Sequence, residues 1–127
     1  MDTRELYEKG LKLRKEMVGH EAVEQRMSAL GPFGGPLQAI INAYAYGDVW
    51  SRPVVPLATK SLAMIAMMAA QGRATELRVH VSGALTNGCT AEQIQEILLL
   101  VALYCGIPAA NEAHRAALDV LREAGAA

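Results

Sequence analysis

Residues 57–71 read LATKSLAMIAMMAAQ, a nearly all-apolar run whose one charged side chain, Lys60, lies in its first turn. The run is longer than an ordinary strand, and Pro56 immediately before it suits the first turn of a helix. Because nearly every face of such a helix would be apolar, we expect it to be the central, buried helix of the fold. No stretch of the chain alternates between apolar and polar residues as a half-buried strand does. The sequence therefore predicts an all-α fold, a compact bundle of about six to seven helices.

Glycine and proline residues mark the ends of the other expected helices. Residues 48–56 form the clearest non-helical segment, because Pro53 disfavours helix at Arg52. Thr90 and Gln93 have the spacing of a capping box for the helix that follows them. The expected helices run from the Asp2–Thr3 cap to Gly19, over 20–30, over 37–46 up to Gly47, from 72 to about 86, over 91–105 and over 108–124.

Length, composition and charge limit the possible classes of function. A chain of 127 residues is expected to form one domain, residues 1–127, with a single core. Its hydrophobic fraction of 52% is more than so small a domain readily hides, so we expect some helix faces to be buried against other copies of the chain in a homo-oligomer. The formal net charge of −1 gives no electrostatic reason to bind nucleic acid or an anionic membrane.

The apolar runs and the cysteines indicate the cellular location of the protein. The longest apolar run, residues 97–110, is too short to span a bilayer and contains Gly106 and Pro108. Cys89 and Cys105 form neither a CxxC motif nor a metal-ligand set, and no signal peptide is visible, so we expect a cytoplasmic protein. Cys89, in a turn, is expected to be exposed, whereas Cys105, at the end of an apolar helix, is expected to be a small buried hydrophobe.

Residues 72–80, GRATELRVH, carry an acid and a histidine four positions apart. On a helix, Glu76 and His80 would lie side by side on one face, so Glu76 could hold the imidazole in one tautomer and raise its basicity. A histidine oriented by a carboxylate is a common acid–base arrangement. The alternative is a surface ion pair of little energetic consequence.

A loop and two further arginines offer binding residues. Trp50 and Arg52 fall in the expected loop, where they could form a lid or an edge that binds substrate. Alternatively, Trp50 plugs the end of the bundle and Arg52 is solvated. Arginine is well suited to bidentate binding of a carboxylate, and Arg73 and Arg78, which flank the Glu–His pair, are further candidates.

Signatures of the common cofactor enzymes are absent. The sequence contains no Walker loop, no GxGxxG turn, no HExxH zinc motif and no GxSxG elbow. The two remaining histidines, His20 and His114, lie on charge-rich helices and are expected at the surface. Any chemistry is therefore expected to proceed without a cofactor or a bound metal.

Several short segments occur in an order that resembles one known family. They are residues 50–53 (WSRP), 61–62 (SL), 65–67 (IAM), 76–80 (ELRVH), 87–88 (NG) and 104–111 (YCGIPAAN). In order and spacing they are similar to the carboxymuconolactone decarboxylase family. That resemblance implies an all-α fold like that of alkyl hydroperoxidase D and a ring-like homo-oligomer, commonly a hexamer. The peroxidase branch carries a CxxC motif where this chain has Arg73 and Glu76, while its histidine corresponds to His80, which argues against thiol peroxidase chemistry.

The resemblance also implies an activity, the cofactor-independent loss of CO2 from a carboxylated lactone during the breakdown of aromatic compounds. On this hypothesis His80, oriented by Glu76, returns a proton to ring carbon, Arg52 anchors a carboxylate and Trp50 covers the pocket. The chain departs from the family pattern at Val54-Val55, where Gly-Leu is usual, and at Lys60 and Ser82, where Arg is usual. Three alternatives therefore stay open: a related lyase or isomerase acting on another lactone or oxo acid, a thiol-dependent peroxidase or reductase, and a non-enzymatic binding protein.

Overall fold

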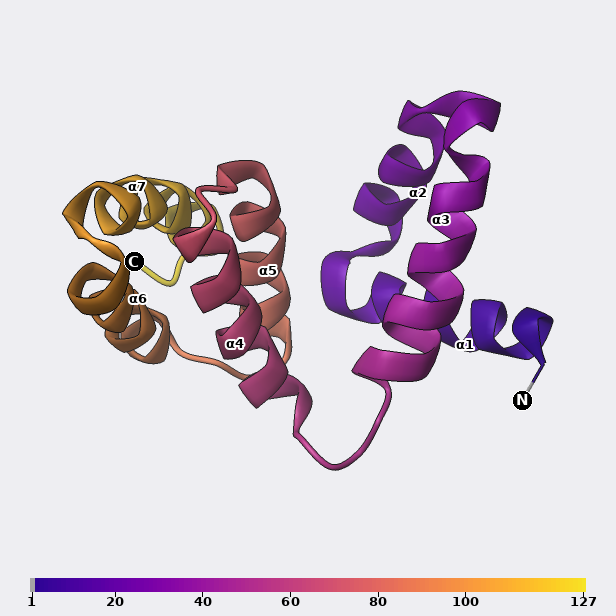
Figure 1. Cartoon of the computed structure of the whole chain (residues 1–127), viewed down its shortest axis with the longest axis horizontal. Helices are drawn as coiled ribbons and strands as arrows, with labels where there is room; N and C mark the ends of the chain where they lie inside the picture. Colours follow the sequence, from indigo (N-terminus) through magenta and orange to yellow (C-terminus); the bar gives the residue numbers. More distant parts are fainter. Residues whose placement is uncertain (1) are drawn as a thin grey trace. The chain divides into compact units, whose positions relative to one another are not determined.

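The computed structural model describes residues 2–127, which are almost entirely helical and contain no strand (Figure 1). This confirms the predicted all-α class, and the seven α-helices among the described residues agree with the expected number. In chain order the elements are α1 (Thr3–Val18), α2 (His20–Ala29), the 3-10 helix η1 (Gly31–Gly34), α3 (Gly35–Ile40), the π-helix η2 (Ile41–Trp50), α4 (Leu57–Ala70), α5 (Ala74–Thr86), α6 (Ala91–Cys105) and α7 (Ile107–Glu123). In this part of the chain, no helix combines the length and the apolarity needed to cross a bilayer.

The helices group into two compact units that divide between Leu57 and Ala58. We call residues up to Leu57 the amino-terminal unit and Ala58–Ala127 the carboxy-terminal unit. The first contains α1, α2, η1, α3 and η2, and the second contains α5, α6, α7 and all but the first residue of α4. The single domain expected from the length of the chain stays a prediction.

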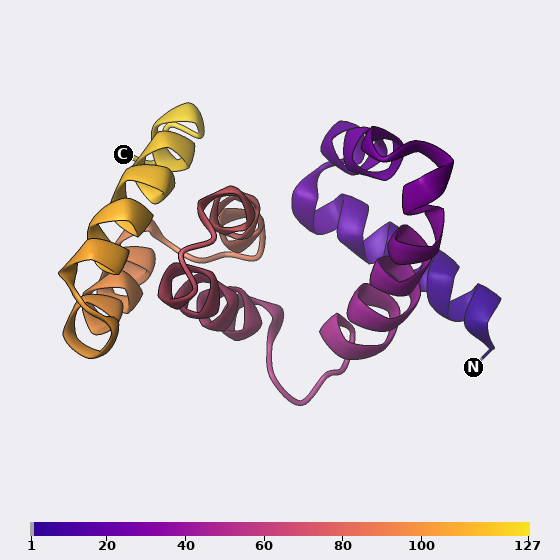
Figure 2. The same cartoon turned by 45° about the horizontal axis from the view of Figure 1, so that its top comes forward.

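In the amino-terminal unit α1 packs across η2, which continues α3 without a break (Figure 2). The two helices approach so closely that only glycine fits at the crossing. A Cβ atom on Gly10 would lie 1.6 Å from the backbone oxygen of Asn42, and one on Gly47 would lie 2.2 Å from that of Leu6. Both side-chain positions are therefore occupied by the neighbouring backbone.

This crossing corrects the expected end of the third helix. We predicted that the helix covers 37–46 and stops at Gly47, but it begins at Gly35 and runs through Gly47 to Trp50. Gly47 is needed for close helix packing and does not end the helix. Consequently residues 48–50 of the expected loop are helical, and only residues 51–56 are irregular.

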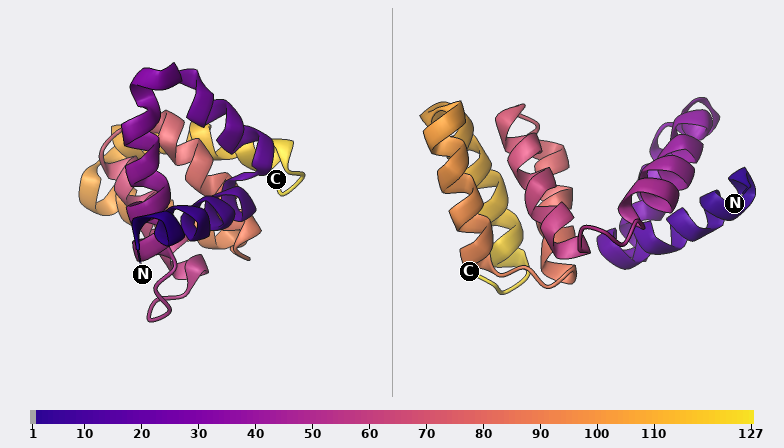
Figure 3. Two further views of the ribbon diagram at one scale, coloured as in Figure 1. Left: turned by 90° about the vertical axis from the view of Figure 1, so that its right-hand side faces the viewer. Right: turned by 60° about the horizontal axis from the view of Figure 1, so that its bottom comes forward.

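The carboxy-terminal unit has its own apolar core, built by α4, α5, α6 and α7. Its most completely buried large side chains are Ile65, Leu77, Val81, Ile94 and Leu98. Helix α7 packs against both α5 and α6, and Figure 3 shows α6 and α7 side by side. The predicted capping box is confirmed: the Thr90 hydroxyl accepts from the Gln93 amide at 3.1 Å, and the Gln93 side chain accepts from the Thr90 amide at 2.9 Å.

The expectation that α4 is the central, buried helix of the fold is wrong. Only Ser61, Ile65 and Ala69 are buried on this helix, a single stripe at four-residue spacing, while Met67 is 47% exposed. The buried stripe of α5 is wider. An apolar composition shows that a helix is able to bury several faces, but the number of neighbours decides how many it does bury.

Candidate functional site

A hollow in the amino-terminal unit has the size of a small-molecule site. Its volume is about 350 Å³, within the range common for ligand pockets. Helix α1 lines it with Lys9, Lys12, Leu13 and Glu16, and the end of η2 with the segment that follows contributes residues 50–53 and 55–57. The hollow therefore brings Trp50 and Arg52, both predicted to bind substrate, to one concave surface.

Trp50 is fixed at this hollow by an aromatic stack. It is only 8% exposed, and its ring lies nearly parallel to that of Tyr46, with 5.8 Å between centroids and 10° between planes. Trp50 thus combines the two roles that we considered, since it is largely buried like a plug and also lines the hollow.

Behind the stack lies a buried cation that our reading of the sequence assigned no role. Arg14 is 5% exposed, and its guanidinium lies 5.8 Å from the centroid of the Tyr46 ring. It donates hydrogen bonds to the side-chain oxygens of Gln38 at 2.8 Å and Asn42 at 3.0 Å. The spacing of four between Gln38, Asn42, Tyr46 and Trp50 is a signal that could have revealed this buried stripe.

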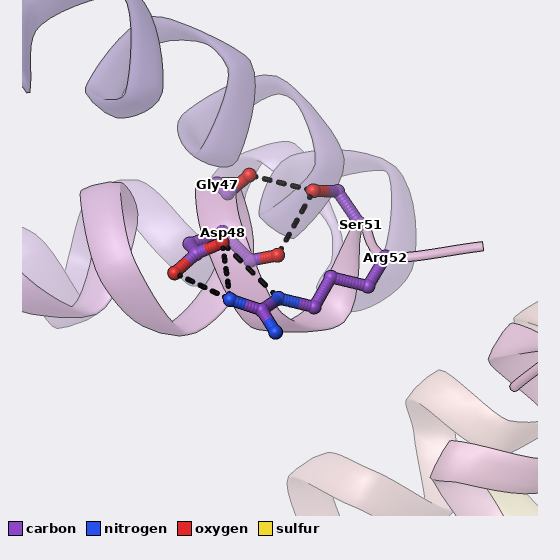
Figure 4. A network of polar contacts seen from close by, with 4 residues as sticks. All are labelled: Gly47, Asp48, Ser51 and Arg52. Atoms are coloured by element: carbon purple, nitrogen blue, oxygen red, sulfur yellow. Dashed lines mark hydrogen bonds and ion pairs between the residues drawn. The ribbon is translucent and has the colours of Figure 1, made fainter. Parts of the chain in front are cut away.

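Arg52 is held at the end of η2 by an acid from the preceding turn. Its Nη2 lies 3.1 Å from Oδ1 and 3.2 Å from Oδ2 of Asp48, and its Nε lies 3.2 Å from Oδ1. Figure 4 shows the guanidinium folded back onto this carboxylate, beside the Ser51 hydroxyl, which donates to the Gly47 carbonyl at 2.6 Å. Both side chains of the pair are well exposed, so the pair is weak and a ligand carboxylate can compete for the guanidinium.

The predicted acid–base pair lies in the carboxy-terminal unit. Glu76 and His80 both belong to α5, so the helical spacing on which their pairing depends is confirmed. His80 is 8% exposed, next to the buried residues Leu77, Val81 and Ala84 of the same helix, whereas Glu76 is exposed. The imidazole of His80 is therefore shielded from water, whereas the carboxylate of Glu76, one turn earlier, is in contact with water.

The other two candidate arginines are engaged on the surface of the same unit. Arg78 forms an ion pair with Asp119 of α7, with 3.1 Å between Nη2 and Oδ2. Arg73, at the residue before α5, donates from Nε to the side-chain oxygen of Gln71 at 3.1 Å. Of the six candidate site residues, Trp50 and Arg52 belong to the amino-terminal unit, and Arg73, Glu76, Arg78 and His80 belong to the carboxy-terminal unit.

Comparison with known proteins supplies the family. Residues 35–119 match the model of the carboxymuconolactone decarboxylase family, and this match covers more than half of the chain. The chain belongs to that family. It is 38% identical over 127 residues to 4-carboxymuconolactone decarboxylase of Acinetobacter baylyi, an alignment that covers all of this chain and 95% of the relative. It is also 38% identical over 110 residues to nitrosuccinic acid decarboxylase of Metarhizium robertsii, covering 87% of this chain and 77% of that protein.

The two cysteines of this family member are placed opposite to expectation. Cys105 is exposed at the last residue of α6, where the chain turns at Gly106. Cys89 is buried because the turn before α6 folds back onto the start of α4, where its thiol donates to the Ala58 carbonyl at 3.3 Å. Burial raises the pKa of the Cys89 thiol, which lowers its share of reactive thiolate.

The cysteines are also too far apart to act as a redox pair within one chain. Cys89 precedes α6 and Cys105 is the last residue of this helix, whose 15 residues span about 22 Å at the ordinary helical rise. The Cα atoms of a disulfide lie about 4.4–6.8 Å apart. A disulfide between Cys89 and Cys105 of one chain would therefore require α6 to unfold.

Proposed function

We propose that this protein catalyses the cofactor-independent decarboxylation of 4-carboxymuconolactone to 3-oxoadipate enol-lactone and CO2. The observation that carries the proposal is the 38% identity to 4-carboxymuconolactone decarboxylase, which extends over all 127 residues. Membership of the family, shown independently by the match over residues 35–119, supports it. The reaction belongs to the catabolism of aromatic compounds through protocatechuate, and the chain would work in the cytoplasm.

The chemistry of this substrate allows catalysis by protein side chains alone, without a cofactor. The lactone carries one carboxylate on the ring and another on an acetate arm. When CO2 leaves the ring, the electrons left behind spread through the double bond into the lactone carbonyl, so the substrate is its own electron sink. The protein has to bind the remaining carboxylate, stabilise the dienolate oxygen and return a proton to ring carbon.

Each of these tasks has a candidate side chain. His80, in its largely buried position on α5, supplies the proton, and Glu76 orients the imidazole. Arg52 binds the acetate carboxylate, since its exposed pair with Asp48 is weak enough to be displaced. Trp50 closes the pocket against water, and Arg73 and Arg78 add positive charge on and beside α5.

The direct test is to incubate the purified protein with 4-carboxymuconolactone and measure the CO2 released. We expect CO2 and enol-lactone to appear in equal amounts at a rate that increases linearly with protein concentration. Treatment with a chelator and dialysis should leave the rate unchanged. Release no faster than in a control with heat-denatured protein would rule the proposal out.

A related decarboxylation of another acid is the second candidate, because nitrosuccinic acid decarboxylase is equally similar over a shorter alignment. Both named substrates are dicarboxylic acids, so they place similar demands on positive charge in the site. Val54, Val55, Lys60 and Ser82, which depart from the family pattern, are the residues that favour a changed substrate. Comparing kcat/KM for 4-carboxymuconolactone and for nitrosuccinate decides between the two candidates.

We further propose that the chain assembles into a homo-oligomer, a ring of six copies. Fifteen large apolar side chains among the described residues are exposed to water, and exposed apolar surface often marks an interface. The most exposed of them are Phe33, Val54, Leu103, Tyr104 and Ile107. Burial of these side chains against other copies would account for the high apolar content of the sequence.

A further inference from the structure

Two lysines of α1 face the hollow that contains Trp50 and Arg52. Lys9 and Lys12 are three residues apart, so they project from one side of the helix, and both line the hollow. Neither ammonium group forms a hydrogen bond or an ion pair with the residues that the structure describes. Lys15 of the same helix differs, since it binds Glu24 of α2 at 2.6 Å. The charges of Lys9 and Lys12 are therefore available to a ligand.

The charge around the hollow favours an anion. Lys9, Lys12 and Arg52 bring three positive charges to its lining, against the single carboxylate of Glu16. Asp48 offsets part of the charge of Arg52, but it does not line the hollow. Three cations around one small concavity repel one another, and an anion with two charges relieves that repulsion more effectively than one with a single charge.

The remaining walls are apolar and stiff, which suits a small organic ligand better than an inorganic ion. Trp50 is fixed by its stack on Tyr46, and the segment after it contains Pro53 and Pro56, whose rings restrict the backbone. Leu13 supplies a further apolar wall from α1. A ligand with two charged ends and a short carbon skeleton matches this combination of cations and apolar surface.

We propose that this hollow binds small dicarboxylates and that Lys9 and Lys12, together with Arg52, recognise their carboxylate groups. The inference rests on the proposed function in one respect, namely that the dicarboxylate bound in the cell is the substrate of the decarboxylation. The binding of a dicarboxylate to the hollow is measured without any turnover. Recognition by the lysines extends the substrate contacts from the loop after η2 to the first helix of the chain.

Succinate is a suitable probe, because it carries two carboxylates on a short saturated skeleton and has no electron sink that would let it lose CO2. Trp50 is the only tryptophan in the sequence, so the fluorescence of the full-length protein reports directly on the hollow. We expect succinate to change the emission of Trp50 in a saturable way and to release or absorb heat in a calorimeter with the same Kd. Butyrate, with one carboxylate, should bind more weakly, and added sodium chloride should weaken succinate binding.

The variant K9Q/K12Q removes both charges from the hollow and should raise the Kd of succinate about 10-fold. The matched control R4Q/R122Q also removes two positive charges, but from exposed arginines that do not line the hollow, and should leave the Kd unchanged. E16Q removes the one opposing charge and should tighten binding. Circular dichroism of every variant checks that the helices are intact.

The inference is overturned if succinate changes neither emission nor heat, or if K9Q/K12Q and R4Q/R122Q bind it equally well. Decarboxylation assays of the same variants distinguish a failure of this inference from a failure of the proposed function. If K9Q/K12Q decarboxylates 4-carboxymuconolactone with the KM of the natural chain, the lysines do not contact the substrate, although the proposed function stands. If no CO2 is released but succinate binds in a lysine-dependent way, the hollow is a dicarboxylate site and the proposed function fails.

Discussion

His80 is the side chain whose loss should affect catalysis most. It lies on α5 with 8% of its surface exposed, so water does not readily replace its imidazole as a proton donor. Replacement by glutamine keeps the size and polarity of the side chain but removes the proton transfer. We expect kcat for 4-carboxymuconolactone to fall by about 10²–10⁴-fold with little change in KM.

Glu76→Gln is the companion experiment to His80→Gln. If Glu76 acts by orienting His80, its replacement lowers kcat by a smaller factor than His80→Gln, leaves KM unchanged, and is partly rescued by Glu76→Asp. A His80→Gln protein with native helicity and undiminished turnover would contradict the role of His80 and leave Glu76 without a catalytic function.

The two thiols should react with a disulfide reagent at very different rates. Cys105 is exposed, whereas Cys89 is buried against the Ala58 carbonyl with a raised thiol pKa. Because the thiolate is the reactive form, we expect one thiol per chain to react rapidly at pH 8, at protein concentrations low enough to dissociate the proposed oligomer, and the second only after unfolding in guanidinium. The absorbance of the thiol released from the reagent measures the reaction. Cys105→Ser should remove its fast phase, and Cys89→Ser should keep it. Two fast phases in the native protein would contradict the burial of Cys89.

At the scale of the element, the amino-terminal unit depends on the crossing of α1 and η2. Their backbones touch at Gly10 and Gly47, and this contact lets Arg14 of α1 reach the side-chain oxygens of Gln38 and Asn42. The same approach sets the position of Tyr46 beneath the guanidinium and thereby of Trp50 at the hollow. The geometry of the candidate binding site thus depends on two glycines that have no side chain with which to contact a ligand.

Gly10→Ala should separate these helices. The new methyl group would lie 1.6 Å from the Asn42 carbonyl oxygen, a backbone atom that cannot move aside without moving η2. We expect the free energy of unfolding to fall by about 3 kcal/mol, at the upper end of the cost of overpacking. Chemical denaturation followed by circular dichroism measures this loss.

Gly35→Ala is the matched control for Gly10→Ala. Gly35 has helical dihedral angles of −53° and −50°, and a Cβ atom there meets nothing within 4 Å. Alanine should therefore stabilise the protein or leave it unchanged, within about 1 kcal/mol, because it restricts the unfolded chain. Equal stability of the two variants would mean that the crossing is looser than these contacts indicate.

At the scale of the whole molecule, the exposed apolar side chains are the feature that supports the proposed assembly. Leu103 and Tyr104 near the end of α6 are 76% and 82% exposed, and Ile107 at the start of α7 is 68% exposed. In the same unit, Met67 of α4 and Leu100 of α6 line one shallow apolar hollow. We expect the protein to sediment as a multimer, six times the 13.6 kDa chain if the ring is a hexamer.

Leu103→Lys should lower the sedimenting mass at a given protein concentration, because a charge would have to be buried at the contact between copies. Glu123→Lys, at the exposed end of α7, is the control that adds positive charge without removing apolar surface, and its mass should equal that of the natural chain. A natural chain that sediments at 13.6 kDa would contradict the proposed assembly.

Much of the local structure followed from short-range patterns in the sequence. The capping box at Thr90 and Gln93 and the helical spacing of Glu76 and His80 depend on residues within one turn of each other, so periodicity and residue type are enough to predict them. The candidate site was less accessible to such reasoning. Lys9 and Lys12 carry no motif, and the hollow exists only because residues about forty positions later fold against α1.

The sequence by itself determined the all-α class, most helix boundaries and the family. Helix periodicity and caps depend on residues close together in the sequence, and family membership depends on residues identical to those of its members. Only the tertiary structure decided that Gly47 serves packing, that α4 buries a single stripe, and that Cys89 is buried while Cys105 is exposed. Each of these features depends on which backbone or side chain from a remote part of the sequence packs beside the residue. Burial and close approach are set by those long-range contacts, which local periodicity does not contain.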